Sequence, residues 1–436
     1  MASGNDFLLL YLLMGDGLEI NFEDTADCIA RSLVQEIIND NYSPRFNIGF
    51  LNLDTSTMED FKEIILQNNL STIFLSFIRK NNLFSIIDKD FNEKCNFQKN
   101  RFQIHSLEII KEVHKLNDIF KKNELNPMFL KGIPIQCEYK DVTLRPLIDI
   151  DILFKKSEVL RAYELLHRKD FLNVSEKKYL NKKNFVHFCN NSHHIQLLTK
   201  NNIAIELHHR ITRPRDFFEC PITSCMYENS RSIEYYGKKI NVPSIEDMII
   251  HQLSHFSIQS DFNKLLRTLN DIKKIIDNNN INWHKIISKY KNKKIRKGIC
   301  LSLELLDLNK VIIEDLDRAK VSFAEYFPEK NILQEAQKKL FGIKKRERGE
   351  IYYEYSLSAD YSKKTFSRIM LPSKNWLIYK YKIAKPGLHI ILLAYMRHYY
   401  HLSSKILDLV FFITKNNFSS KFVKYENSIT LWLNKG

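Results

Sequence analysis

The sequence predicts an α+β protein with a mixed-sheet core between two helical regions. Apolar residues recur at three-to-four spacing in the first hundred residues and again after residue 244, which indicates amphipathic helices. Between these regions, short apolar runs bounded by turn residues indicate strands. Only 11 glycines and 10 prolines occur among 436 residues, which favours long helices over a loop-rich fold. We therefore expect an N-terminal helical region (1–100), a core (101–243) and a C-terminal helical domain (244–436).

The core is expected to alternate helices and strands. Asn201 and Asn202 separate its last two strands and predict a tight hairpin turn. The expected elements, in order, are a helix over 102–122, a strand near Pro127–Leu130, a short helix, a strand over Leu147–Phe154, a helix over Val159–His167, and strands over His194–Leu198 and Ile203–His208.

The helical regions have weaker landmarks. The apolar segment Phe7–Met14 has no preceding basic residue and no cleavage-like end, so we expect a packed first helix there and not a signal peptide. Ser244 followed by Glu246 and Asp247 predicts a helix start, because a serine cap and acidic first-turn residues favour one. Further helices are expected near 244–258, 261–277, 283–295, 298–307, 328–341 and, as one or two apolar helices, Leu388–Thr414, with a loop or linker over 343–375.

The net charge of +15 suits an anionic partner such as nucleic acid, an acidic peptide or a nucleotide. The charge is diffuse, and its densest runs, 285–297 and 338–348, lack the interleaved aromatics of a single-strand binding platform. A solvated surface is therefore the plainer interpretation of these runs, while nucleic acid stays open as a partner.

The cysteines and the apolar runs bear on the compartment. Seven cysteines, an odd number without regular spacing, indicate reduced thiols and hence a cytoplasmic protein. No apolar run approaches the roughly 20 residues that span a bilayer, so no membrane partner is expected.

The most informative feature is the pair Asp149 and Asp151 in the apolar strand Leu147–Phe154. Side chains alternate between the faces of a strand, so both carboxylates point the same way, roughly 7 Å apart along the backbone. Like charges on a buried strand repel one another and lose hydration, and a divalent cation such as Mg²⁺ would neutralise them. The alternative is an edge strand with both aspartates on a solvated face.

The neighbouring residues favour a metal and phosphate site. Lys131 and Gly132 follow an apolar strand end, where a lysine attracts phosphate and a glycine lets backbone N–H groups approach an anion. Arg145 could reach a phosphate or pin a carboxylate. Glu206 lies on another apolar strand and could sit beside the aspartates. Together these are the parts of metal-assisted phosphoryl or nucleotidyl transfer.

The sequence resembles the uncharacterised nucleotidyltransferases of the polymerase-β-like superfamily, in the group with LKG and DID motifs. The resembling residues are Leu130-Lys131-Gly132, the run from Arg145 to Leu153, and Ile205-Glu206-Leu207-His208. Weaker similarities extend through His251–His255, Leu266–Ile272, Ile281–Trp283 and Leu371–Arg397.

The resemblance implies a polymerase-β-like nucleotidyltransferase core with a mixed sheet, flanked by helical regions. It implies that Asp149, Asp151 and Glu206 bind Mg²⁺ or Mn²⁺, and that the Lys131–Gly132 turn holds the triphosphate. The implied reaction transfers a nucleoside monophosphate from an NTP, such as ATP, to an acceptor. By the same resemblance, His255 faces the nucleotide.

Histidines surround these motifs. One member of each pair, His193-His194 and His208-His209, should face the site, and His208 is favoured because it shares the face of Glu206. A structural histidine is the alternative for each. His251 and His255 have zincin-like spacing, but glutamine stands where the general-base glutamate is needed, so a core or cleft role is expected.

Two other functions stay open at this point. One is a catalytically inactive nucleotide-binding scaffold or sensor, and the other is a toxin-like nucleotidyltransferase that modifies tRNA. The sequence does not identify the acceptor, which could be a peptide, a small molecule or RNA, nor the preferred base.

Overall fold

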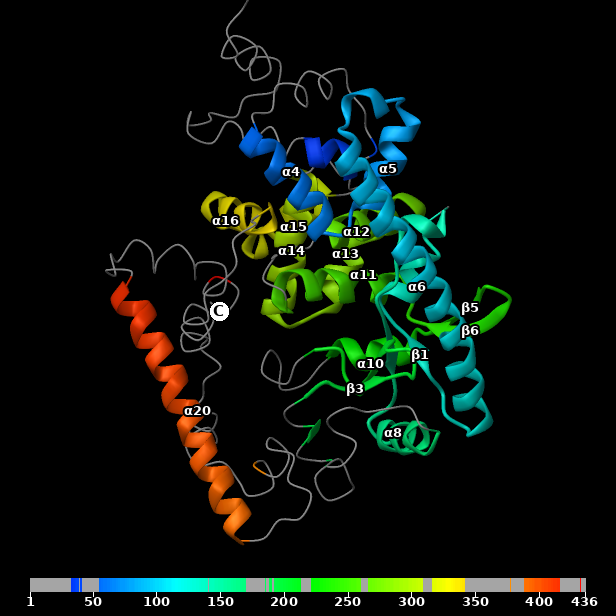
Figure 1. The fold of residues 1–436 in the computed structure, drawn as a ribbon, viewed down its shortest axis with the longest axis vertical. Coiled ribbons are helices and arrows are strands. Elements are labelled where there is room, and N and C mark those ends of the chain that lie inside the picture. Colours follow the sequence, from blue (N-terminus) through cyan, green and yellow to red (C-terminus); the bar gives the residue numbers. More distant parts are fainter. Residues whose placement is uncertain are drawn as a thin grey trace, which may run out of the picture.

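The computed structural model describes residues 33–38, 40, 55–139, 141–169, 185, 188–189, 192–212, 221–259, 266–308, 316–341, 377, 388–415 and 432. Within these ranges the protein has one six-stranded mixed sheet and many helices, as predicted for the α+β class (Figure 1). Most helices lie together at one end of the molecule, and the sheet lies toward the other end beside several more. The apolar segment expected at Phe7–Met14 and the loop expected over 343–375 lie outside the described residues.

The sheet has the strand order β3-β4-β2-β1-β6-β5. β2 is parallel to β4 and antiparallel to β1, and β1 is parallel to β6. β3–β4 and β5–β6 are antiparallel hairpins, the second of which the sequence analysis did not locate. The strands are β1 (Met128–Phe129), β2 (Asp149–Leu153), β3 (His194–Leu198), β4 (Ala204–His208), β5 (Arg231–Tyr235) and β6 (Lys238–Val242).

The hairpin turns follow from residues that accept positive φ. Asn202 has φ 59° in the β3–β4 turn, and asparagine tolerates the left-handed region well. Tyr236 and Gly237 have φ 49° and 83° in the β5–β6 turn, as a type I′ hairpin requires.

The two faces of the sheet differ in polarity. Ile150 and Ile152 of β2, together with Ile205 and Leu207 of β4, enter a hydrophobic core with helices α6 (Lys89–Lys122) and α8 (Val159–Arg168). Because side chains alternate along a strand, the intervening acidic and imidazole side chains occupy the opposite face. One face of the sheet is therefore packed by helices and the other is polar.

Helix α6 joins two hydrophobic cores. It is longer than the helix expected over 102–122, since Asp88 caps its start and accepts a hydrogen bond from the Phe91 backbone N–H at 2.7 Å. Phe91 belongs to the core of the helical part, whereas Phe120 belongs to the core beneath the sheet. Figure 1 shows α6 running along the side of the molecule from one part to the other.

Helices from both ends of the described chain share the first core. Buried residues of α4 (Thr55–Gln67) and α5 (Ser71–Lys80) lie in one cluster with those of the C-terminal helices from α11 to α16. The domain boundaries expected at residues 100 and 243 stay a prediction. The C-terminal helices are α11 (Ile245–Ser254), α12 (Leu266–Asn278), α13 (Trp283–Lys289), α14 (Lys293–Leu308), α15 (Leu316–Ser322), α16 (Lys330–Phe341) and α20 (Leu388–Lys415).

Several helix boundaries differ from the expected ones. A single helix over 283–295 is wrong, because Asn292 begins α14 by accepting a hydrogen bond from the Ile295 backbone N–H at 3.2 Å. A π-helical turn over His255–Gln259 continues α11, and Pro221–Glu228 forms the unexpected helix α10. The short elements are α7 (Gly132–Gln136) and the 3₁₀ turns Phe84–Ile86, Val142–Leu144 and Ala324–Tyr326.

None of the helices in the described ranges has the length and apolar character needed to cross a membrane.

Candidate active site

Parallel pairing of β2 and β4 brings the acidic side chains together. Asp151 is the register partner of Glu206, and Asp149 is that of Ala204. Alternation puts all three carboxylates on the polar face of the sheet. Asp151 is buried, with only 1% of its surface exposed, whereas Asp149 and Glu206 are partly exposed.

Lys131 is the main counter-ion of this acidic group. Its Nζ lies 2.5 Å from Oδ1 of Asp151 and 3.7 Å from Oε2 of Glu206. Burial opposes the charge of the ammonium group, but Asp151, Glu206 and Asp149 outweigh it and raise the pKa of Lys131. Although burial disfavours the charged carboxylate, Lys131 and His208 hold the pKa of Asp151 below its usual value.

The backbone at Lys131 has a conformation that favours glycine. Lys131 precedes α7 with φ 48° and ψ −113°. A side chain in such a region costs about 1–3 kcal/mol and persists where surrounding contacts fix it. The next residue, Gly132, is closely packed: a Cβ there would lie 3.1 Å from Cδ2 of Leu147, which would have to shift to make room. Both residues of the expected phosphate turn are thus held by tight local geometry.

His208 completes the buried part of the site. Its Nε2 lies 2.8 Å from Oδ1 of Asp151 and 3.3 Å from Oε2 of Glu206. Burial lowers the pKa of an imidazole, but these two carboxylates reverse the shift and raise the pKa of His208. Its Nδ1 is buried and has no hydrogen-bond partner among the described residues.

Asp149 differs from the other two carboxylates. Its carboxylate forms no hydrogen bond or ion pair with the described part of the chain. Burial, followed by repulsion from Asp151, raises its pKa to about 6. One oxygen or nitrogen each of Asp151, Glu206 and His208 lie within 4.8 Å of one another, as metal ligands do. Asp149 is outside that set, so an ion touching all three carboxylates requires a side-chain movement.

Arg145 lies next to the carboxylates but faces a different partner. It is buried, and its Nε lies 2.7 Å from Oδ1 of Asp271 on α12. The Tyr139 hydroxyl donates to the same oxygen at 2.7 Å. Of the two roles expected for Arg145, the structure contains the carboxylate contact, and a phosphate contact stays a prediction. The sequence analysis missed Asp271 because its contact with Arg145 joins distant segments.

Helix α11, its π-helical continuation and α12 bring imidazole and guanidinium groups into the electrostatic neighbourhood of Lys131 and the carboxylates. Burial, followed by the charge of Lys131, lowers the pKa of the half-buried His255 to about 4. His251 is buried, and its pKa is also lowered by burial and Lys131. Arg267 was not singled out from the sequence; burial, followed by repulsion from Arg145, lowers its pKa to about 10. His255 therefore lies in the electrostatic neighbourhood of Lys131, and its contact with a nucleotide stays a prediction.

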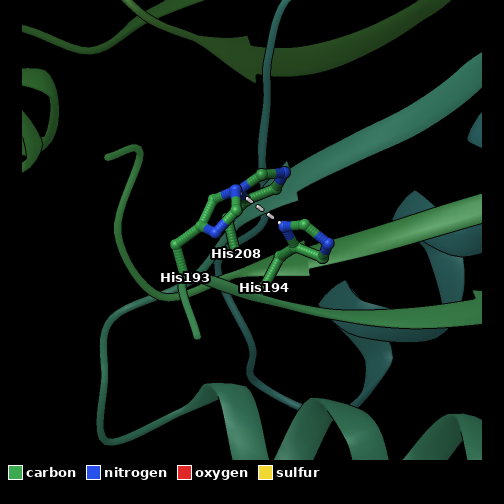
Figure 2. Close-up of side chains that lie close together, drawn as sticks. All are labelled: His193, His194 and His208. Atoms are coloured by element: carbon green, nitrogen blue, oxygen red, sulfur yellow. Dashed lines mark hydrogen bonds between the residues drawn. The ribbon is translucent and has the colours of Figure 1, made fainter. Parts of the chain in front are cut away.

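The β3 strand adds polar groups beside Glu206. Gln196 is its register partner and donates a hydrogen bond from Nε2 to Oε1 of Glu206 at 3.0 Å. His194 lies nearby, with its Nε2 3.6 Å from the same oxygen. His193 and His194 lie together with His208 in Figure 2. Gln196 was missed, because an amide on a strand has no sequence signal until its cross-strand partner is known.

Fold and site together define an α+β nucleotidyltransferase type, with a mixed sheet that presents an acidic strand pair between flanking helices. The family model described as uncharacterised nucleotidyltransferase matches residues 55–309, more than half of the chain. The chain therefore belongs to this family, as the resemblance implied. No curated protein and no solved structure matches the chain.

Replacing Arg145 should destabilise the fold even without any ligand. Arg145→Met leaves the buried Asp271 without its cation, and such a loss typically costs about 3–5 kcal/mol. Urea unfolding of the ligand-free protein measures this loss, with the exposed Arg161→Met as a matched control that should change stability little. An unchanged stability together with weakened NTP binding would instead assign Arg145 to phosphate.

Asp149→Asn should stabilise the metal-free protein at neutral pH. The pKa of Asp149 is raised to about 6 in the folded protein, whereas an aspartate in the unfolded chain has a pKa of about 4. Ionisation of Asp149 therefore opposes folding fully above pH 6, and this effect disappears as the pH falls to about 4. One pKa unit corresponds to about 1.4 kcal/mol, which predicts a gain of roughly 1–3 kcal/mol at pH 7.5.

Thermal unfolding in EDTA between pH 4 and pH 8 tests this gain. The gain should fade as the pH falls from 6 to 4, and the exposed Asp317→Asn should show no such trend. A gain that is independent of pH would show that the charge of Asp149 is not its cause.

Proposed function

We propose that this chain is a metal-dependent nucleotidyltransferase that transfers a nucleoside monophosphate from an NTP to an acceptor hydroxyl. The observation that carries the proposal is the register pair Asp151–Glu206, with Asp149 on the same face and Lys131 between the carboxylates. Membership of the nucleotidyltransferase family supports the same reaction class.

The donor atoms fit a hard divalent cation. Carboxylate oxygens are the ligands that Mg²⁺ and Mn²⁺ take in phosphate-transfer sites. Asp149, Asp151 and Glu206 would hold the cation, and His208 adds a nitrogen within reach of Asp151 and Glu206. When bound, such a cation neutralises triphosphate charge and stabilises the transferring phosphoryl group.

Lys131 has a second role in this proposal. In the structure its ammonium group neutralises Asp151, the position that a cation would neutralise instead. Lys131 therefore exchanges its carboxylate partner for phosphate oxygens when the site is loaded. Its strained backbone keeps the side chain aimed into the site in both states.

Glu206 is placed to orient the acceptor. Gln196 holds its Oε1 from one side, and Lys131 and His208 contact its Oε2 from the other. The acceptor oxygen forms a bond to the α-phosphorus, the bond from that phosphorus to the bridging oxygen breaks, and pyrophosphate leaves. The acceptor proton passes to solvent or to Glu206.

The alternatives are less well supported. An inactive scaffold has no need of the buried Asp151 beside a second carboxylate, nor of the strained counter-ion Lys131. For an RNA acceptor, a pocket of about 410 Å³ is lined by basic side chains including Lys111, Lys122 and Lys238. This pocket lies on α6, and the buried residues of α6 pack against the apolar face of the sheet. The carboxylates lie on the opposite face, so the pocket does not adjoin them.

The proposed compartment is the cytoplasm. The five described cysteines, Cys95, Cys137, Cys189, Cys225 and Cys300, are all free thiols, which suits a reducing compartment.

The decisive experiment incubates the full chain with each labelled NTP and Mg²⁺ or Mn²⁺, in the presence of peptide, small-molecule and RNA acceptors. Transfer of label with release of pyrophosphate is the expected result, and the preferred NTP identifies the base. NTP binding without transfer to any acceptor would favour the scaffold, and label on tRNA alone would favour the toxin-like enzyme.

Lys131→Ala should weaken binding of Mg·NTP by roughly 10- to 100-fold, because a charge-assisted phosphate contact is worth about 1.5–3 kcal/mol. The same variant should be less stable in EDTA, since Asp151 loses its cation. Added Mg²⁺ should restore that stability.

Lys131→Gly is the matched variant. It removes the same charge but suits the positive φ, so it should bind NTP as weakly as Lys131→Ala while being more stable. Calorimetry and thermal unfolding separate the two effects. Normal NTP binding by both variants would make Lys131 purely structural.

Glu206→Gln should reduce turnover far more than NTP affinity. The substitution keeps the size and the Gln196 contact but removes the charge, while Asp149 and Asp151 still hold a cation carried with the triphosphate. We expect at least about a hundredfold loss of transfer rate, in the range typical of lost acid–base or electrostatic groups. The exposed Glu234→Gln on β5 is the control, and equal losses of affinity and rate would contradict the assigned role.

A further inference from the structure

Three imidazoles gather at one end of the β3–β4 hairpin. His193 precedes β3, His194 begins it and His208 ends β4. The ring centroids of His193 and His194 are 4.1 Å apart, and the ring centroid of His208 lies 5.5 Å from that of His193 and 5.1 Å from that of His194. Figure 2 shows the three rings turned toward one another, with Nε2 of His193 2.8 Å from Nδ1 of His194.

The hairpin fixes this arrangement through its backbone. His194 and His208 are register partners on antiparallel strands, so their side chains share one face. The His209 backbone N–H donates to the carbonyl of His193 at 3.1 Å. The Ser192 hydroxyl donates to the carbonyl of His194 at 2.8 Å. The three rings are thus presented by a paired strand end and not by a free loop.

The bonding of His208 leaves one ring nitrogen for another partner. Its Nε2 is held by Asp151, while Nδ1 is buried without a hydrogen-bond partner among the described residues. A buried unpaired polar atom costs about 1–3 kcal/mol, so it calls for an explanation. A carboxylate on one nitrogen of an imidazole and a metal on the other is a common arrangement, because the carboxylate orients the ring and raises its basicity.

We propose that His193, His194 and His208 form a binding site for a divalent transition-metal ion of intermediate softness, and that Zn²⁺ fits it best. One nitrogen from each ring lies within 4.8 Å of the others, close enough for an ion with bonds of about 2.0–2.1 Å after small side-chain shifts. Three imidazoles suit Zn²⁺ and disfavour Mg²⁺, which takes oxygen ligands.

This site is distinct from the carboxylate site but adjoins it. Oε1 of Glu206 lies 3.6 Å from Nε2 of His194, so Glu206 stands between the two ligand groups. Three protein ligands leave a fourth position open for water or an acceptor oxygen. The imidazole ligands all come from the hairpin, and no step of the proposed reaction is needed to bind an ion there, so the site holds whether or not the chain transfers nucleotides.

Zinc binding by the full, metal-stripped chain tests the site. Calorimetry with Zn²⁺ in excess Mg²⁺ should give one tight equivalent, and Co²⁺ should give the visible absorption of a four-coordinate nitrogen site. His193→Gln and His194→Gln should each weaken Zn²⁺ binding by at least about tenfold, a loss seen even when a residue that only hydrogen-bonds a metal ligand is replaced.

Two controls locate the ion. His209→Gln changes a histidine of the same hairpin whose Nε2 contacts the carbonyl of Ser192, and it should bind Zn²⁺ normally. Asp149→Asn should retain the tight Zn²⁺ equivalent, because Asp149 lies outside the imidazole group. Thermal unfolding in EDTA verifies that each variant folds. If one of the His193 and His194 variants does not fold, the other is enough for the test.

The outcomes are separable. Lost Zn²⁺ binding in the His193 or His194 variant, with both controls intact, supports the site. Absence of tight binding in the unaltered chain overturns it. Zn²⁺ binding that survives both histidine variants but disappears in Asp149→Asn also overturns it and places the ion at the carboxylates. Failure of nucleotide transfer with Zn²⁺ binding intact would leave this site standing and reject only the proposed reaction.

Discussion

Neutralisation of the buried Asp151 is the constraint on which the rest of the site depends. An uncompensated carboxylate with 1% exposure would be strongly destabilising, so the fold must supply positive partners. They come from the two strands that flank β2: Lys131 lies in the turn after β1, and His208 lies at the end of β4. The glycine-like backbone of Lys131 follows from this demand, since the short turn into α7 must aim an ammonium group back at β2.

A second buried ion pair fixes where this site lies relative to the helices. Arg145 on the approach to β2 contacts Asp271 on α12, and Tyr139 bonds the same carboxylate. The polar face of the sheet is thereby tied to the helical core, while α6 joins both cores on the other side. Arg267 and His255, brought by the same helices, then line the electrostatic neighbourhood of the carboxylates. Burial is the first cause of the lowered pKa values of His255 and Arg267 and of the raised pKa of Asp149.

Local patterns predicted much of this from sequence. Strand alternation placed Asp149 and Asp151 on one face, and the apolar runs located β2, β3 and β4 to within two residues. The same alternation put His208 on the face of Glu206. Two features set by more distant residues were missed, namely the contact of Arg145 with Asp271 and the pairing of Gln196 with Glu206. A third failure was local: the side-chain cap of Asn292 breaks a segment whose apolar periodicity predicted one helix. The roles assigned to the site residues remain predictions, because contacts among them do not show what they bind.

The site contains two kinds of donor atom that a metal ion could use, and their separation follows from the sheet. Oxygen donors lie on β2 and the middle of β4, while nitrogen donors lie at the end of the β3–β4 hairpin. Only His208 belongs to both ligand groups, with one ring nitrogen on Asp151 and the other unpaired. The carboxylates therefore reach the imidazoles at two points, Asp151 through His208 and Glu206 through His194. Loading the acidic group with a cation would withdraw Asp151 from His208 as it does from Lys131, so the occupancies of the two ligand groups should be coupled.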